Sequence, residues 1–249
     1  MVQPIKKQVK IDGKLYSLAT VYNNPGNIED TEGYAGTIGR YAMEREKIRT
    51  RLAANREGIL EEQTTLAGRT GFAHFDHKVS GLRALAVDIN AKLNKPNMTL
   101  DLLVHKYAPP RDNVGTLENY KKFVLNTVAE KTDLSIETLL QPNFIETAGV
   151  GRDVVIKAIM RGKTNFENAN IAFYDTKQNK AVRAKDYYDD ASIDEAVLLS
   201  KNTDYSKNTS YEQMKESLSD KVKNQVDNSK YPQDTLDITA ADFGFKENV

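Results

Sequence analysis

The stretch that decides the fold is Ser80-Gly81-Leu82-Arg83-Ala84-Leu85-Ala86-Val87-Asp88-Ile89-Asn90-Ala91-Lys92-Leu93. One side of it is apolar at the three- and four-residue spacing of an amphipathic α-helix, at Leu82, Leu85, Ala86, Ile89 and Leu93. Ser80 is a candidate N-terminal cap, and Pro96 ends the helix. A helix of this kind needs apolar partners, so the pattern predicts a core built from helices.

Further helical patterns follow this one along the chain. They cover residues 100–107, a stretch after Thr116, residues 135–140 and residues 152–161. Pro109 and Pro110 end the first of them, because the residue before a proline disfavours α geometry. We therefore predict a small, mainly α domain over residues 17–163.

The flanking segments differ in character from this domain. Residues 1–16 indicate an extended N-terminal arm with a hairpin-turn dipeptide, Asp12-Gly13. Residues 164–200 indicate a small α/β extension, with a strand at 171–174 that turns near Asn179. Residues 201–249 are mostly polar, so we expect a C-terminal arm that orders only against a partner surface.

Residues 41–67 form an insertion that is dense in charges of both signs. Ile48, Leu52 and Ile59 recur at spacings of four and seven, which predicts a helix with one narrow apolar seam. The seam suits a partner helix or self-association, and it equally suits packing against the helix's own domain. We expect it, with the two arms, to bind other proteins and to form a homo-oligomer.

Composition excludes several classes of protein. The 249 residues contain no Cys, which rules out disulfides, Cys-ligated zinc and a cysteine nucleophile. The 35 basic residues balance 35 acidic ones, which argues against a dedicated nucleic-acid binder. No window is apolar for long enough to span a membrane, and charges interrupt the start where a secretory signal would need an apolar run. We expect a protein made in a cytoplasm.

The three histidines give no signature of a metal or cofactor site. His74 and His77 flank Asp76, and His105 lies on a predicted helix, but no helical His-Glu-x-x-His motif accompanies them. A Ser–His–Asp triad stays open, although no Gly-x-Ser-x-Gly elbow supports it. The glycines of residues 26–39 match no nucleotide-binding loop. We therefore expect no metal and no cofactor.

Carboxylates are the remaining chemical resource of the sequence. Glu29, Asp30 and Glu32 lie in the glycine-rich loop, and Glu44 lies just beyond it. Cleavage of a glycosidic bond needs a protonated carboxyl group as general acid, usually a Glu whose pKa is raised beside apolar surface. The alternative is that these groups are solvated loop charges, as most Asp and Glu residues are.

Five motifs stand in a fixed order along the chain. They are Tyr22-Asn23-Asn24-Pro25-Gly26-Asn27-Ile28, Gly36-Thr37-Ile38-Gly39, Gly71-Phe72-Ala73-His74-Phe75, Gly81-Leu82-Arg83-Ala84-Leu85-Ala86 and Tyr107-Ala108-Pro109-Pro110-Arg111-Asp112-Asn113. Over residues 20–160 the series resembles a domain of tailed-phage virion proteins that is described as structural or lysozyme-like. The charged insertion at 41–67 departs from that pattern, and the family motif itself supplies no catalytic Glu.

The resemblance implies a fold, a location and two functions. The fold is a lysozyme-like helical domain, and the location is a virion assembled in the host cytoplasm. In the first function the domain binds or cleaves peptidoglycan, as a glycosidase or lytic transglycosylase. Its acid candidates are Glu29, Glu32 and Glu44, and its glycan-binding candidates are Asn23, Asn24, Asn27, Phe72, Phe75 and Tyr107. In the second function the domain is a non-enzymatic assembly module that contacts other virion proteins.

Overall fold

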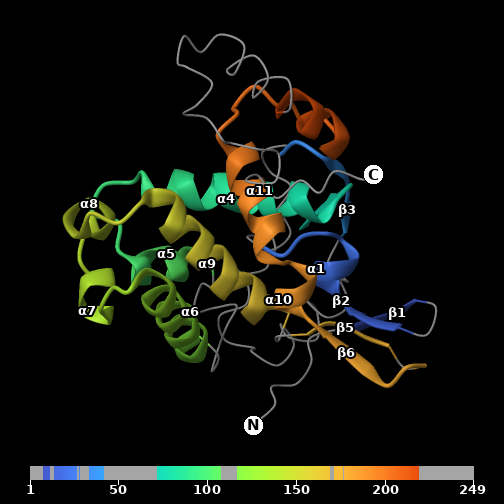
Figure 1. Ribbon diagram of the computed structural model, residues 1–249, viewed down its shortest axis with the longest axis horizontal. Coiled ribbons are helices and arrows are strands. Elements are labelled where there is room, and N and C mark those ends of the chain that lie inside the picture. Colours follow the sequence, from blue (N-terminus) through green and yellow to red (C-terminus); the bar gives the residue numbers. More distant parts are fainter. Residues whose placement is uncertain are drawn as a thin grey trace, which may run out of the picture.

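The computed structural model describes residues 8–11, 14–26, 28, 34–41, 72–107, 117–168, 171–175 and 177–218. Within these ranges the protein is mainly α, as the sequence predicts, with two small antiparallel sheets (Figure 1). The predicted charged helix of residues 41–67 lies outside the description apart from Tyr41, so it stays a prediction. None of the helices in the described ranges is long and apolar enough to cross a membrane.

Helix α4 (Lys78–Leu93) is the central element of the core. Leu82, Leu85 and Ile89 are fully buried, which confirms the apolar side that the sequence predicts. The cap differs from the expected one. His77, and not Ser80, precedes the helix, and its Nδ1 accepts a hydrogen bond of 3.2 Å from the backbone N–H of Val79.

The helices that follow build one half of the molecule (Figure 1). They are α5 (Leu100–Tyr107), α6 (Leu117–Thr132), α7 (Ile136–Leu139), α8 (Phe144–Ala148) and α9 (Arg152–Glu167). Ser135 caps α7, with its Oγ 3.1 Å from the backbone N of Thr138. Helices α6 and α9 pack closely along each other, because Gly162 leaves room for the backbone of Val124.

Strands from both ends of the chain share one sheet. The order is β1-β2-β5-β6, from β1 (Gln8–Ile11), β2 (Lys14–Ser17), β5 (Ile171–Asp175) and β6 (Lys180–Arg183). Strands β1 and β2 form the hairpin that Asp12-Gly13 predicts, and Tyr16 pairs with Phe173 across β2 and β5. The described part of the expected N-terminal arm therefore forms two of the four strands of a sheet, in which β2 pairs with both β1 and β5.

Short helices connect this sheet to the core. Helix α1 (Leu18–Val21) follows β2, and α10 (Ala184–Tyr187) follows β6. The hydroxyl group of Tyr188, just after α10, donates a hydrogen bond of 3.1 Å to the carbonyl of Ala19 in α1. A second sheet pairs β3 (Thr37–Tyr41) with β4 (Phe72–Phe75).

The C-terminal part of the chain belongs to the same core. Helix α11 (Asp190–Ser200) packs along α4 and buries Ile193, Val197 and Leu199. Residues 202–218 continue over the domain and end in a helix at 211–218, whose Met214 is fully buried. The structure thus does not separate residues 164–200 from the helical domain, and the described part of the expected polar arm packs on its own chain.

Candidate functional site

Four of the five motifs meet at one junction, where the loop of residues 22–28 crosses β4 and the start of α4. Asn24 lies at its centre and is 0% exposed. Its Nδ2 donates to the carbonyls of Ile28 and Ala73, at 3.0 and 2.9 Å, and its Oδ1 accepts from the N–H of Ile28 at 2.8 Å. Both amide hydrogens are therefore used within the chain, and none is left for a sugar. The geometry favours a structural role for Asn24.

Asn23 holds the loop against the neighbouring elements. Its backbone has a left-handed φ of 51°, a conformation that Asn tolerates. Its Nδ2 donates to the carbonyl of Phe75 at 3.1 Å. A Cβ atom on Gly81 would lie 1.7 Å from the Asn23 carbonyl oxygen, so the first residue of the Gly-Leu-Arg-Ala-Leu motif has to be glycine.

Gly36 brings the second motif to the same junction. Its φ is +77°, and its carbonyl accepts a hydrogen bond of 2.8 Å from the N–H of Asp76. A side chain at this position would clash with Ser80 and Asp76, whose nearest atoms lie 2.6 and 2.7 Å from an added Cβ. Both the conformation and the space therefore require glycine.

Of the described aromatic side chains of the motifs, Phe75 is buried, whereas Tyr22 and Tyr107 are partly exposed. Phe75 is fully buried in the core, and of Phe72 only the backbone, in β4, is described. The hydroxyl group of Tyr107 is buried at the end of α5, and burial, followed by the nearby charge of Asp88, raises its pKa well above the ordinary value. The Nζ atoms of Lys92 and Lys163 lie 4.5 and 4.3 Å from its ring centroid. The described geometry therefore places Phe75 in the core and Tyr107 beside lysines of α4 and α9, and it does not bring these two rings together along one groove.

Arg83 of the fourth motif anchors the C-terminal elements. It is 4% exposed, and its Nε and Nη2 donate to the carbonyls of Leu199 and Asn202, at 3.2 and 2.9 Å. These carbonyls lie at the C-terminal end of α11, where the Leu199 carbonyl also accepts a longer bond of 3.3 Å from the Asn202 N–H. The guanidinium also lies 5.0 Å from the ring centroid of Tyr205. Arg83 therefore ties α4 to a segment far along the chain.

The Ser, His and Asp side chains near this junction do not form a triad. The Ser80 hydroxyl donates to Asp76 Oδ1 at 2.6 Å, while His77 caps α4 and its ring stacks on Tyr211 at a centroid distance of 3.9 Å. Burial lowers the pKa of His77, with a further contribution from Lys78. No three His, Cys, Asp or Glu side chains converge as metal ligands within the described ranges.

The acid candidates cannot be placed from this structure. Glu29, Glu32 and Glu44 lie outside the described residues, and so does Asn27 of the glycan-binding candidates. Their roles stay predictions. Among the candidates that are described, Asn23, Asn24 and Phe75 come together at the junction, whereas Tyr107 lies at the other end of α4, near Lys92.

Sequence reasoning missed a contact between α4, α11 and the helix at 211–218. The backbone N–H of Tyr211 donates to Asp76 Oδ2, and its hydroxyl donates to Glu195 Oε1, both at 2.8 Å. Burial raises the pKa of the Glu195 carboxyl, even though the Tyr211 hydrogen bond acts in the opposite direction. The sequence does contain a signal for the helix at 211–218, because Ser210 and Gln213 form a capping box at its start.

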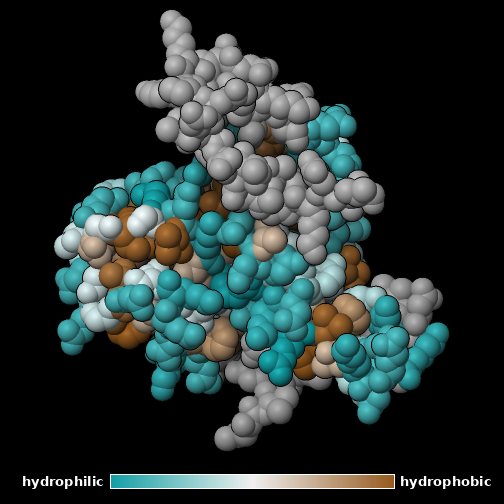
Figure 2. Space-filling view, in the orientation of Figure 1, coloured by the Kyte–Doolittle hydropathy of each residue, from teal (hydrophilic) through white to brown (hydrophobic). Residues whose placement is uncertain are grey.

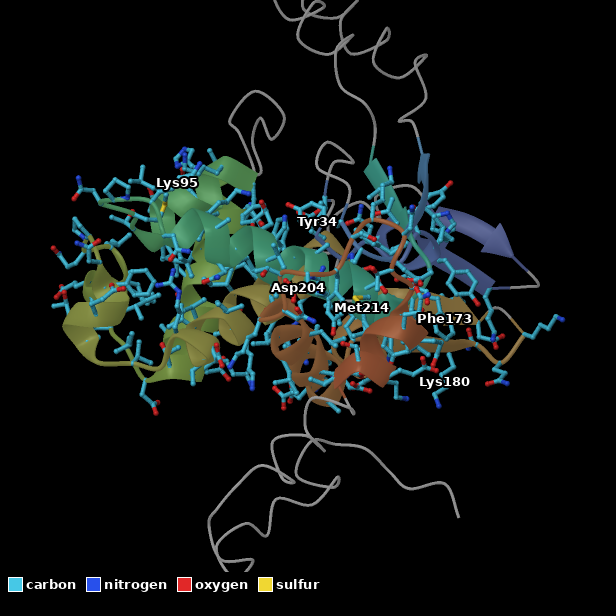
Figure 3. The ribbon with its side chains drawn as sticks, turned by 90° about the horizontal axis from the view of Figure 1, so that it is seen from above. Tyr34, Lys95, Phe173, Lys180, Asp204 and Met214 are labelled. Atoms are coloured by element: carbon cyan, nitrogen blue, oxygen red, sulfur yellow. The ribbon has the colours of Figure 1, made fainter. Side chains whose placement is uncertain are left out.

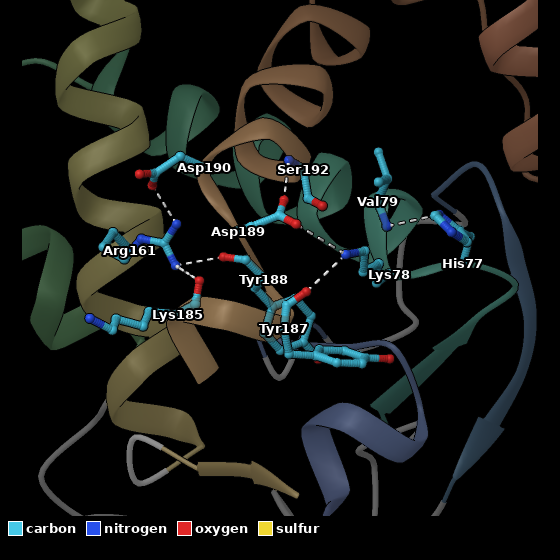
Figure 4. Close-up of polar contacts among 10 residues, drawn as sticks. All are labelled: His77, Lys78, Val79, Arg161, Lys185, Tyr187, Tyr188, Asp189, Asp190 and Ser192. Carbon is cyan, nitrogen blue, oxygen red and sulfur yellow. Dashed lines mark hydrogen bonds and ion pairs between the residues drawn. The ribbon is translucent and has the colours of Figure 1, made fainter. Parts of the chain in front are cut away.

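A second polar network joins α4, α9, α10 and α11 (Figure 4). Arg161 on α9 donates to the carbonyl of Tyr188 and forms an ion pair with Asp190, each at 2.5 Å. Lys78 on α4 donates to the carbonyl of Tyr187 at 2.8 Å and lies 3.8 Å from Asp189. Both cations bind backbone carbonyls next to α10, so the network positions elements and presents no reactive group.

Comparison with known proteins adds no assignment. The chain matches no model of a protein family, and a search of curated proteins finds no match to it. The resemblance to virion proteins therefore stays a prediction from the motifs. What the described geometry offers chemically is a set of internally bonded side chains that fix how the elements meet.

Proposed function

We propose that this chain is a structural protein of a tailed-phage virion whose lysozyme-like helical domain serves as an interaction module and not as a glycan hydrolase. The observation that supports a non-enzymatic role is Asn24, whose amide group is fully buried and hydrogen-bonded within the chain. The amide most central to the motif series has no hydrogen available for a glycan.

The junction also supports the resemblance from which the virion assignment comes. Asn23, Gly36, Ala73 and Gly81, one from each of four motifs, contact one another's segments through backbone groups or close approach. Such contacts give these four motifs a shared structural role in this chain. A structural role of this kind can be kept without catalysis.

Exposed apolar side chains favour contacts with other proteins. Ile136, Leu140 and Val154 are 36%, 41% and 45% exposed, and all lie on or beside α7 and the start of α9. Apolar side chains are visible at this end of the molecule, near α8 (Figure 2). Ile38 on β3 is 62% exposed. In the proposed function such positions face other virion proteins, together with the insertion at 41–67 and the chain termini.

The virion assignment is tested on purified particles. Mature particles of the phage that encodes this chain, separated by density gradient, are digested and analysed by quantitative mass spectrometry. We expect peptides of this chain at a fixed copy number per particle. A chain found only in the soluble fraction of the infected cell would contradict the assignment.

The non-enzymatic assignment is tested on peptidoglycan. Purified protein is incubated with sacculi, and released muropeptides are measured beside a lysozyme control. We expect no release. Release that is lost in Glu29→Gln, Glu32→Gln or Glu44→Gln would instead establish the glycosidase function and identify its acid.

A further inference from the structure

One face of the four-stranded sheet carries a charged row beside an aromatic row. Residues paired across antiparallel strands lie on the same face. The two rows are Lys14, Asp175 and Lys180, and Tyr16, Phe173 and Val182. Ala172 points to the opposite face and is fully buried. The two rows share one face, on which Lys180 is exposed, Lys14, Tyr16 and Phe173 are partly exposed and Asp175 is buried, at the end of the molecule where Figure 3 labels Phe173 and Lys180.

The aromatic row offers ring surface at the edge of the molecule. The ring centroids of Tyr16 and Phe173 lie 5.1 Å apart with an interplanar angle of 35°. Tyr187 on α10 meets Phe173 edge-on at 6.3 Å. All three side chains are only half-buried. Partly exposed rings on a sheet are a kind of surface on which single-stranded nucleic acids stack their bases.

Cations surround these rings. The Lys14 ammonium lies 5.3 Å from the Phe173 ring centroid, and Lys177, Lys180 and Arg183 are exposed on the β5–β6 hairpin. The carboxylate of Asp175 is held by its own turn, because its Oδ1 accepts from the backbone N–H groups of Lys177 and Gln178, at 2.9 and 3.0 Å. The charges of Lys14 and Lys177 also act on this carboxylate and help to lower its pKa, so it offsets part of their positive charge.

The local charge differs from that of the whole chain. The sheet segments 8–17 and 171–185 carry six basic residues and two acidic ones, whereas the full chain is neutral. The overall balance argued against a dedicated nucleic-acid binder, but that average hides a basic excess over these strands, which the exposed Asp186 of α10 only partly offsets. A local excess of this kind attracts phosphates, and salt screens the attraction.

We infer that this sheet face binds single-stranded nucleic acid, with bases stacking on Phe173 and Tyr16 and phosphates pairing with Lys14, Lys180 and neighbouring cations. When a phosphate draws the Lys14 ammonium aside, the Phe173 ring becomes free for a base. A single strand fits better than a duplex, because a duplex keeps its base faces stacked internally. This inference stands apart from the proposed virion function.

Fluorescence anisotropy of a labelled oligothymidine of ~20 nucleotides tests the inference on the full chain, in about 50 mM salt. We expect Phe173→Leu to weaken binding about tenfold, because it removes a stacking ring. We expect Lys180→Gln to weaken binding and to lower the slope of log affinity against log salt by about 0.7. The matched controls Phe123→Leu and Lys122→Gln on α6 are expected to bind as the parent does. A duplex of equal length should bind more weakly.

Three results would overturn the inference. The first is that the protein does not bind the oligonucleotide, and the second is that the α6 controls lose as much affinity as the sheet variants. The third is that heparin binds as tightly as the oligonucleotide and Phe173→Leu has no effect. The last result would reduce the face to a general polyanion surface. Lys180 is exposed, so Lys180→Gln keeps the test decisive even if Phe173→Leu unfolds the protein.

Discussion

At the scale of single residues, Asn24 shows how an amide in a sequence motif is used. An Asn24→Ala substitution removes the partners of the Ile28 N–H and the Ala73 carbonyl, while the Ile28 carbonyl keeps its bond of 2.9 Å from the Ala73 N–H. We expect a loss of about 3 kcal/mol in the free energy of unfolding, because each buried unpaired group costs about 1–3 kcal/mol. Urea unfolding followed by circular dichroism measures it. Asn119→Ala, at an exposed position of α6, is the control, and a similar loss there would contradict the prediction.

A substitution of Gly81 tests the close approach between the start of α4 and the backbone of Asn23. In Gly81→Ala the added Cβ meets the backbone oxygen of Asn23, which cannot rotate away as a side chain would. We expect a loss of about 3 kcal/mol or more. Gly151→Ala serves as the control, since its nearest neighbour, Val154 Cγ2, lies at an ordinary 3.5 Å. Equal unfolding midpoints for the two variants would show that the junction is looser than described.

The residue scale also shows why the site was harder to predict than the fold. The sequence suggested that Asn23, Asn24 and Asn27 would contact a glycan, because free amides suit sugar hydroxyls. Whether an amide is free depends on its tertiary partners. The partner of Asn24 on β4, the carbonyl of Ala73, is far away in the sequence and has no signature of its own. Phe75 is similar, since an aromatic residue in a short strand can face either a groove or a core.

At the scale of elements, Arg83 controls the attachment of α11 and the segment after it. Arg83→Met removes the side-chain donor to the Asn202 carbonyl and leaves the Leu199 carbonyl with backbone donors only, and we expect a loss of about 1–3 kcal/mol. Hydrogen exchange should show faster exchange in residues 202–218 than in α6. Arg83→Lys keeps the charge but not the planar fork, so an intermediate loss is expected. Uniformly faster exchange across all helices would refute a local role.

The contact between Tyr211 and Glu195 predicts a pH dependence of stability. Burial raises the Glu195 pKa above its ordinary value of 4.5, so the folded protein holds a proton that the unfolded chain releases. This contribution to stability is complete below pH 4.5 and is lost as the pH rises through the folded pKa. Glu195→Gln stays neutral and can still accept from Tyr211. We expect the melting temperature of Glu195→Gln to increase relative to that of the parent protein as the pH rises from 4 to 7.

The control for this prediction is Glu216→Gln, which changes an exposed carboxylate on the helix at 211–218 that carries Tyr211. It removes the same charge without the burial, so its difference from the parent should stay flat over the pH range. If Glu195→Gln raised the melting temperature as much at pH 4 as at pH 7, the result would argue against a raised pKa of Glu195.

Elements were predictable where their signal is local. The spacing of Leu82, Leu85 and Ile89 suffices for α4, and Asp12-Gly13 suffices for the β1–β2 hairpin. The pairing of β2 with β5 was not predictable, since short strands give no signal for a distant partner.

At the scale of the whole molecule, the expected domain boundary after residue 163 gives a clear prediction. A fragment of residues 17–163 lacks α11, which covers α4, and lacks Ala172 and the β5–β6 hairpin. We expect this fragment to lack cooperative thermal unfolding and to show poorly dispersed amide NMR signals. A fragment of residues 8–218 keeps these elements and should unfold in one transition. Cooperative unfolding of the 17–163 fragment would instead support a domain boundary after residue 163.

The pairing of Tyr16 with Phe173 also has a consequence for synthesis of the protein. Strand β2 leaves the ribosome early, but its partner β5 is translated much later. At about 5–20 residues per second, the β1–β2 hairpin waits on the order of ten to thirty seconds for β5. Throughout that interval the edge of β2 carries unpaired N–H and C=O groups, the kind of edge that pairs with other strands. On a polysome the nearest competing β5 belongs to the nascent chain ahead, so the order of translation itself favours exchange between neighbouring copies.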